Sequence, residues 1–309
     1  MTAVVTVPDL AESLGVEAEL RLLREFIAEW IEQASRELRE MLRWQLLDHS
    51  KYFRPATIFA CHRSVTGGRV SASLLRSAVA LELFHNVSLI VDDILDRSRL
   101  RRGKATLHCR FGSLPALMAA GYLAAGVFQL VASDRYSVLL LSELMQRLGV
   151  AECTQWRLRR QPLGVTDWRA IAAEDTGSMF EVCARLGTRD DRLRRFGLLL
   201  GILYHGCDDV GDVRGAAALG GGGDEDLRDG ILTLPAAIAI RDPKVAVLFR
   251  AGGGDGRTIL VKRMRDVLGD AETYLDEIAT STEEEARKNA SHPQPLIELV
   301  RRTRSLSKC

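Results

Sequence analysis

Apolar residues recur along most of this chain at intervals of three and four, the spacing that places them on one face of an α-helix. The interval is clear in residues 9–49, where Leu20, Leu23, Ile27 and Ile31 alternate with charged positions. The same pattern predicts further helices over 55–66, 72–96, 115–132, 136–149, 167–187, 192–213, 231–250, 257–280 and 283–305. Sustained alternation with a period of two, the mark of a strand, is not found. The sequence therefore predicts an all-α protein.

Three segments call for separate interpretation. Residues 97–113 are basic and irregular, and residues 215–223 are nearly all glycine and alanine, which predicts a mobile loop. The run from Leu114 to Ala132 is apolar and almost long enough to span a bilayer. It is rich in alanine and glycine and has no flanking basic clusters, so we expect a fully buried helix and no transmembrane segment.

Composition narrows the class of protein. The chain has 309 residues, is 47% hydrophobic and carries a net charge of +1, which does not favour nucleic acid as a partner. Its six cysteines are scattered without a CxxC pair, and the N-terminus lacks a signal-peptide pattern. We expect a cytoplasmic protein with a single domain over 1–309, N-terminal helices in 9–49 and a basic tail at 301–309.

An acidic pentad, residues 92–96, lies at the end of an apolar segment. Asp92, Asp93 and Asp96 lie at the end of the run from Leu81 to Leu95, and in a helix these positions share one wall. Clustered carboxylates repel one another and are costly to bury unless a cation joins them. Hard divalent cations such as Mg²⁺ take oxygen ligands of this kind. The pentad is therefore a candidate metal site.

A second pentad repeats this spacing far downstream. Asp208, Asp209 and Asp212 lie near the end of the apolar helix expected over 192–213. If the two helices run parallel, both pentads line one mouth of a central cavity. Carboxylates facing each other there would hold several Mg²⁺ ions, whose coordination a polyanion such as a diphosphate would complete. An apolar cavity beneath would suit a hydrocarbon tail.

From about residue 45 to about residue 240 the sequence resembles the trans-isoprenyl diphosphate synthases, also called polyprenyl synthetases. The matching motifs are Lys51 with Arg54-Pro55, the stretch from Glu82 to Asp93, Asp96 with Arg101 to Thr106, Gly201 to Asp212, and Asp226 to Pro235. The resemblance implies an all-α, isoprenoid synthase-type helical bundle around a deep central cavity, usually in a homodimer.

The resemblance also implies roles for the matching residues. The implied metal ligands are Asp92, Asp96 and Asp208, with Asp93, Asp209 and Asp212 as further ligands or their support. The implied substrate contacts are Arg101 for an allylic diphosphate and Lys51, Arg54, His85 and Arg102 for isopentenyl diphosphate, a site that needs no metal in this family. Thr176 and His205, at positions of two further family elements, complete the candidate substrate-binding set.

The departures from the family pattern fall around the allylic diphosphate. The family has lysines at three places where this chain has Asp175, the lysine-free run Gly220 to Gly223, and Ile231, and Tyr204-His205 replaces a Phe-Gln pair. The metal ligands and the isopentenyl site are therefore retained while three cations are missing. The basic tail at 301–309 would offset that loss if it folded over the mouth.

Three functions remain open at this point. The first is a Mg²⁺-dependent prenyltransferase that condenses isopentenyl diphosphate with an allylic prenyl diphosphate. The second is a class I terpene cyclase on the same scaffold, which ionises a prenyl diphosphate without isopentenyl diphosphate. The third is a non-catalytic partner subunit of another synthase, which the two intact pentads disfavour.

Product length depends in this family on side chains just before the first pentad. Small residues there open the cavity floor and bulky ones close it. Val87 and Ser88 argue against the shortest products, and Phe84 lies one turn deeper, where it would set a floor. These residues predict a product of about twenty carbons.

Overall fold

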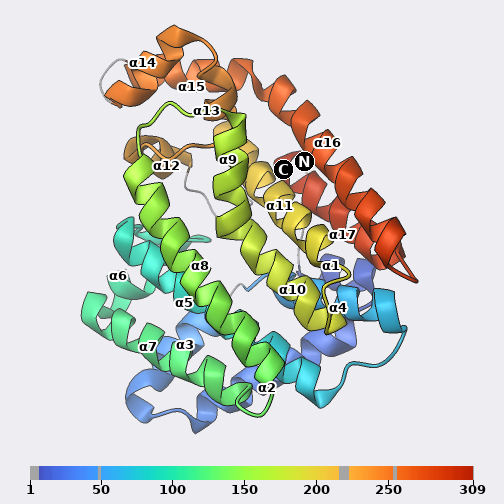
Figure 1. The fold of residues 1–309 in the computed structure, drawn as a ribbon. Coiled ribbons are helices and arrows are strands. Elements are labelled where there is room, and N and C mark those ends of the chain that lie inside the picture. Colours follow the sequence, from blue (N-terminus) through green and yellow to red (C-terminus); the bar gives the residue numbers. More distant parts are fainter. Residues whose placement is uncertain (1–6, 48–49, 216–222, 253–255, 309) are drawn as a thin grey trace.

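The computed structural model of the protein describes residues 7–47, 50–215, 223–252 and 256–308. Almost all of the described chain is helical, which confirms the predicted all-α class (Figure 1). The loop predicted at 215–223 lies, except for its two end residues, outside the described residues.

The N-terminal part of the chain contains four helices, α1 (Val7–Leu14), α2 (Glu17–Gln33), α3 (Arg36–Leu46) and α4 (Phe53–Thr66). The periodic segment at 9–49 is thus three helices, broken at Gly15, whose φ is +64°, and at Ala34. Leu23, Ile27 and Ile31 have no exposed surface, as their spacing predicts. Helices α2, α3 and α4 pack against α5, and α4 carries Arg54 in its first turn.

Helix α5 (Ala72–Leu95) is the long buried helix that the sequence predicts. Ser71 caps its first turn, because its hydroxyl oxygen accepts a hydrogen bond from the Leu74 amide at 3.1 Å. The helix ends in the first pentad, where the Asp96 amide donates to the Asp92 carbonyl at 2.9 Å. The fold therefore holds the pentad on the last turn of a core helix.

A small β-hairpin follows the pentad and corrects the expectation that the chain contains no sheet. Strands β1 (Leu100–Arg101) and β2 (Lys104–Ala105) pair antiparallel, with Arg101 opposite Lys104. The two loop residues Arg102 and Gly103 both have positive φ, 52° and 77°, as the tightest hairpin turns require. Strands of two residues are too short to produce a visible alternation. A short helix, α6 (Leu107–Phe111), comes next.

Helix α7 (Ser113–Leu130) is less buried than the sequence predicts. The exposed fractions of Leu114, Leu117 and Met118 are 68%, 43% and 58%. By length and composition both α5 and α7 could cross a membrane, but two thirds of the apolar window of α5 is buried and only a third of that of α7. The composition of α7 gave no sign that one face stays uncovered, because its alanines and glycines suit either environment.

The middle of the chain contains α8 (Arg135–Leu158), α9 (Val165–Ala172), a π-helical turn (Ala173–Gly177), α10 (Ser178–Thr188) and α11 (Arg194–Arg214). Helix α8 runs nine residues past the predicted end, because Gly149 does not break it. The segment expected as one helix over 167–187 is split by the π-helical turn. Gly201 of α11 lies against this turn, and a Cβ atom there would come within 2.6 Å of the Gly177 Cα.

The described C-terminal elements are α12 (Gly223–Asp229), α13 (Leu234–Ala239), α14 (Pro243–Ala251), α15 (Gly256–Asp266), α16 (Leu268–Asn289), α17 (Gln294–Ser305) and a 3₁₀ turn (Leu306–Lys308). Figure 1 shows α12 to α15 gathered at one end of the molecule. The break predicted between 280 and 283 is wrong. Helix α16 continues through it, and buried Thr282 bonds its hydroxyl to the Ile278 carbonyl at 2.7 Å. The helix ends instead before Pro293.

Candidate active site

Asp92 and Asp93 of the first pentad have different surroundings. Asp93 is buried and accepts a hydrogen bond from Nε of Arg101 at 2.8 Å, which fixes the first strand of the hairpin against α5. Asp92 lies near the carboxylates of Glu152 and Asp175. Burial, with repulsion from these two groups, raises the Asp92 pKa to about 8. Asp92 is thus the member of the pair that a cation would stabilise most.

Asp96 is the last residue of the pentad and caps the C-terminus of α5. One of its carboxylate oxygens accepts a hydrogen bond from Nη2 of Arg159 at 3.3 Å, and its carbonyl accepts one from Nη2 of Arg228 at the same distance. The sequence did not predict either arginine at this position. Both therefore lie beside the first pentad.

Asp208 of the second pentad shares its surroundings with the first. Burial and the neighbouring Asp209 raise its pKa to about 6, while Lys51 and Arg101 act in the opposite direction. Arg101 likewise opposes the rise in the pKa of Asp92. The hairpin arginine therefore lies within electrostatic range of both pentads, which agrees with the expectation that they line one mouth.

Asp209 supports the scaffold. Its Oδ2 accepts hydrogen bonds from the indole Nε1 of Trp168 at 2.8 Å and from the Leu234 amide at 2.7 Å. The second bond satisfies a free amide at the start of α13. Of the two roles that the resemblance allows for this residue, the contacts favour support over metal ligation.

Asp212 faces a carboxylate that the sequence did not predict as part of the site. Burial and the charges of Asp209, Asp212 and Asp208 raise the pKa of Asp226 well above its usual value. Asp226 opens the last of the motifs that carry the family resemblance, so its position in that motif was the signal that could have identified it.

Asp175 and His205, the two residues that differ from the family pattern at these positions, are in direct contact. The His205 Nδ1 lies 3.3 Å from Oδ2 of Asp175 and 2.9 Å from the Thr176 hydroxyl, and its Nε2 lies 3.9 Å from Oδ1 of Asp209. Burial opposes protonation, but Asp209, Asp175 and Asp208 outweigh it and raise the His205 pKa to about 10. The aspartate on the π-helical turn is therefore neutralised by an imidazolium on α11.

The expected isopentenyl site brings Arg54 and His85 together. Arg54 Nη1 lies 2.9 Å from Nε2 of His85, and the guanidinium stands over the Phe180 ring at 5.4 Å. Burial, together with Arg54 and Arg102, lowers the His85 pKa well below its usual value, so the imidazole is neutral. With Nε2 accepting from Arg54, the proton resides on Nδ1, which is buried and has no hydrogen-bond partner within the described residues. A ligand oxygen that entered the buried site would satisfy this donor.

Glu82 lies behind this pair and was not among the predicted site residues. It is fully enclosed, accepts a hydrogen bond from the Ser50 hydroxyl at 3.0 Å, and interacts with the charges of Arg54 and Arg102. Burial raises its pKa above the usual value despite these partners. Ser50 directly precedes Lys51, so this hydroxyl links the first family motif to α5.

The residues expected at the cavity floor lie on α5 below the pentad. Phe84 is buried, and Val87 and Ser88 are half-buried. The Ser88 hydroxyl donates to the His85 carbonyl at 2.8 Å, so it is turned toward its own helix. Their effect on product length stays a prediction.

The acidic side chains of the two pentads offer carboxylate oxygens, which suit Mg²⁺. Burial and repulsion from neighbouring carboxylates raise the pKa values of Asp92, Asp208 and Asp226, and a bound cation would relieve both costs. Among the described residues, no three His, Cys, Asp or Glu side chains already converge on one cation position. The residues therefore fit a divalent cation chemically, and their final arrangement would depend on the ligand.

The basic tail does not supply the missing cations through its most buried arginine. Arg304 is 8% exposed and forms ion pairs with Asp276, at 2.7 Å, and with Glu272. Glu272 also pairs with Arg214 at 2.6 Å. The tail thus fastens the end of α11 to α16, and the guanidinium of Arg304 is held by carboxylates of α16.

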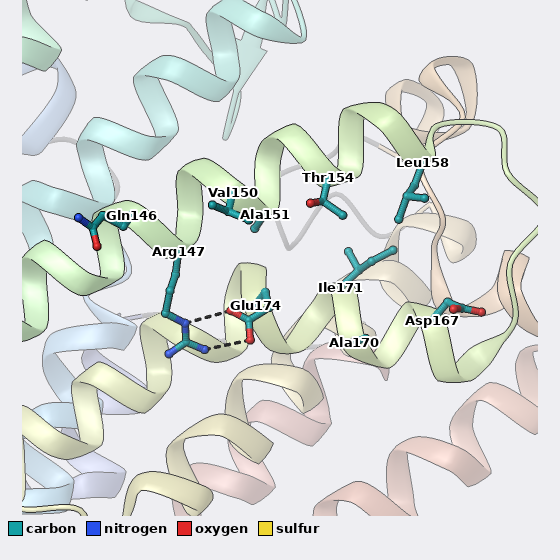
Figure 2. A pocket seen from close by; sticks show the side chains of 10 residues that line it. All are labelled: Gln146, Arg147, Val150, Ala151, Thr154, Leu158, Asp167, Ala170, Ile171 and Glu174. Carbon is teal, nitrogen blue, oxygen red and sulfur yellow. Dashed lines mark hydrogen bonds and ion pairs between the residues drawn. The ribbon is translucent and has the colours of Figure 1, made fainter.

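A separate groove of about 440 Å³ lies between α8 and the segment formed by α9 and the π-helical turn. Figure 2 shows its lining side chains facing one another from these two segments, with Arg147 bonded to Glu174 at one end. It is lined by Gln146, Arg147, Val150, Ala151, Thr154, Leu158, Asp167, Ala170, Ile171 and Glu174. No pentad residue contributes to this lining.

Comparisons with solved structures show the same fold over the whole chain. A polyprenyl synthase from Caulobacter crescentus CB15, complexed with calcium and isoprenyl diphosphate, superposes with a TM-score of 0.86, 21% identity and 99% coverage of both chains. A heptaprenyl diphosphate synthase from Staphylococcus aureus gives a TM-score of 0.85, 20% identity and the same coverage.

Sequence comparisons find plant relatives that match this chain over part of its length. Geranylgeranyl pyrophosphate synthase 11 of Arabidopsis thaliana is 30% identical over 241 residues, 69% of this chain and 67% of that protein. Geranylgeranyl pyrophosphate synthase 4 of the same plant is 28% identical over 230 residues, and the chain spans only 61% of its length. The family model described as Polyprenyl synthetase matches residues 35–281. The chain therefore belongs to the polyprenyl synthetase family.

Proposed function

We propose that the protein is a Mg²⁺-dependent prenyltransferase that condenses isopentenyl diphosphate with an allylic prenyl diphosphate. The observation that carries this choice over a cyclase is the site formed by Arg54 and His85. A cyclase has no second diphosphate to bind, whereas here a guanidinium and an unpartnered imidazole N–H are buried side by side. Geranylgeranyl and polyprenyl synthases among its relatives support the same class of reaction.

Mg²⁺ held by Asp92, Asp96, Asp208 and Asp212 would neutralise charge on the leaving diphosphate. Arg101, between the pentads, would orient that diphosphate. The allylic C–O bond breaks, and the electron pair leaves with the diphosphate. The double bond of isopentenyl diphosphate, held by Lys51, Arg54, His85 and Arg102, attacks the allylic carbocation to form a C–C bond. A proton is then lost from the former isopentenyl unit, and the released diphosphate can accept it.

A product assay tests this proposal. Purified protein is incubated with Mg²⁺ and geranyl, farnesyl or geranylgeranyl diphosphate, with and without labelled isopentenyl diphosphate. We expect label in a longer prenyl diphosphate only when both substrates are present. Hydrocarbon released without isopentenyl diphosphate would instead identify a cyclase. No turnover under any condition would favour a non-catalytic partner subunit.

We propose a product of about twenty carbons, with Phe84 limiting its length. Phe84 is 4% exposed and lies two turns before Asp92 on α5. Removing its ring in Phe84→Ala should lengthen the product by one or more isopentenyl units. The same product from wild type and variant would remove Phe84 from the account.

We also propose a homodimer that covers the exposed face of α7. Leu114, Leu117 and Met118 expose a continuous apolar surface, and covering such area is favourable at about 25 cal/mol per Å². Light scattering after gel filtration should give twice the chain mass for wild type, and Met118→Glu should shift the protein to monomer. A monomeric wild-type protein would contradict the proposal.

A further inference from the structure

Three arginines gather beside Ile231, one of the positions where the family has a lysine. Arg159 and Arg160 follow the last turn of α8, and Arg228 lies on α12. All three contribute to lowering the pKa of Asp229, and the hydrogen bond from Arg228 is the largest cause. Their charges therefore surround one carboxylate.

Backbone contacts dock these two segments together. The Arg160 amide donates to the Gly230 carbonyl at 2.8 Å, and Nη2 of Arg160 donates to the Arg228 carbonyl at 2.5 Å. Arg160 has a positive φ of 59°. A Cβ atom on Gly230 would come within 2.4 Å of its Cγ, so this contact requires glycine. The next residue is Ile231, which stands where the family has a lysine.

Arg159 and Arg228 both reach the first pentad from this platform. Nη2 of Arg159 bonds to Oδ1 of Asp96, and Nη2 of Arg228 bonds to the Asp96 carbonyl, each at 3.3 Å. These bonds are long for charge-assisted contacts, which are usually 2.7–2.9 Å. The guanidinium of Arg159 also stacks over Trp156 at 4.3 Å, and its buried Nε has no hydrogen-bond partner in the described part of the chain.

We propose that Arg159 and Arg228 bind the allylic diphosphate and replace the lysines absent at Asp175 and Ile231. This inference rests on the proposed function. A guanidinium offers a planar set of donors that matches phosphate oxygens, and an unpartnered buried donor is a cost that a phosphate oxygen would remove. Arg160 is a positioning residue, because its bonds to Gly230 and Arg228 hold the two segments together.

Calorimetric titration with inorganic pyrophosphate and Mg²⁺ tests the inference without relying on turnover. Arg159→Gln and Arg228→Gln should each weaken pyrophosphate binding about tenfold, since a hydrogen bond involving a charged group contributes about 1.5–3 kcal/mol. Arg159→Lys should retain most of the affinity. Arg157→Gln, on the exposed last turn of α8, is the matched control and should bind as wild type does.

Isopentenyl diphosphate, titrated without metal, provides the second measurement. Both glutamine variants should bind it within about twofold of wild type. Unchanged pyrophosphate binding in both variants would overturn the inference, as would an equal loss of isopentenyl binding, because the effect would then not be selective. If wild type itself bound no pyrophosphate with Mg²⁺, both the inference and the proposed function would fail. If wild type bound pyrophosphate and the variants bound it equally well, only the inference would fail.

Discussion

The two halves of the candidate site balance their charges differently. On the side of α4 and α5, Arg54 meets a neutral His85 whose second nitrogen still has a hydrogen to donate. On the side of the π-helical turn and α11, Asp175 and Asp209 enclose a protonated His205. The first half offers donors to an anion. In the second half, the positive charge of His205 is already neutralised by Asp175 and Asp209. One half should bind a diphosphate unaided, and the other should need metal.

The largest effect is expected from a pentad substitution. Asp208→Asn should lower turnover by about 10²–10³-fold, because it weakens the binding of the Mg²⁺ that would neutralise the charge developing on the leaving diphosphate. The rate of condensation at saturating substrates measures this. Asp266→Asn, an exposed aspartate at the end of α15, is the control. Turnover of Asp208→Asn within threefold of wild type would remove the second pentad from the chemistry.

The next effect tests whether Asp175 and His205 are energetically coupled. His205→Gln leaves half-buried Asp175 and buried Asp209 without their cation and should lower the free energy of unfolding by about 3 kcal/mol. The double variant with Asp175→Asn should lose about 1–2 kcal/mol less than the sum of the single variants. Urea unfolding measures both quantities, with His292→Gln as an exposed control. Additive losses would show that the two side chains are not coupled.

The same pair has a defined pH dependence. The His205 pKa is raised from 6.5 to about 10 in the folded protein. Its contribution to stability is therefore complete below pH 6.5 and is lost as pH rises through about 10. The stability difference between wild type and His205→Gln should shrink over that range, and a constant difference would contradict the protonated state.

A smaller and more selective effect is expected at Arg54. Arg54→Gln should raise the KM for isopentenyl diphosphate about tenfold to a hundredfold, because it removes a charge-assisted hydrogen bond. The KM for the allylic substrate should change less than threefold. Steady-state kinetics with each substrate varied in turn measure the split. Equal rises in both KM values would show that the two halves of the site are not independent.

Local patterns in the sequence predicted the helices that carry the pentads. Spacing alone placed Asp92 and Asp96 at the end of α5, and the structure keeps them there. The π-helical turn at Ala173–Gly177 was missed, because its sequence, Ala-Glu-Asp-Thr-Gly, carries no local signal that separates it from an ordinary helix. The turn coincides with a tertiary contact, the close approach of Gly201 to Gly177. Such a contact cannot be read from local periodicity.

The sequence also could not predict which charged residues from distant elements lie close together. Glu152 is one of many acids on a helical surface until α8 places it near Asp92, where burial and Asp175 raise its pKa to about 7. Arg159 and Arg228 likewise look like solvent-exposed arginines in the sequence. Their role depends on the docking of α8 onto the segment at Gly230, which only the fold reveals.

Direct binding with and without metal tests the contrast between the two halves most simply. Isopentenyl diphosphate and a non-hydrolysable allylic diphosphate analogue are titrated separately into the protein, first in chelator and then in Mg²⁺. The account predicts isopentenyl affinity that is unchanged within about twofold, and allylic affinity that rises at least about tenfold with Mg²⁺. Equal dependence of both ligands on Mg²⁺ would contradict it.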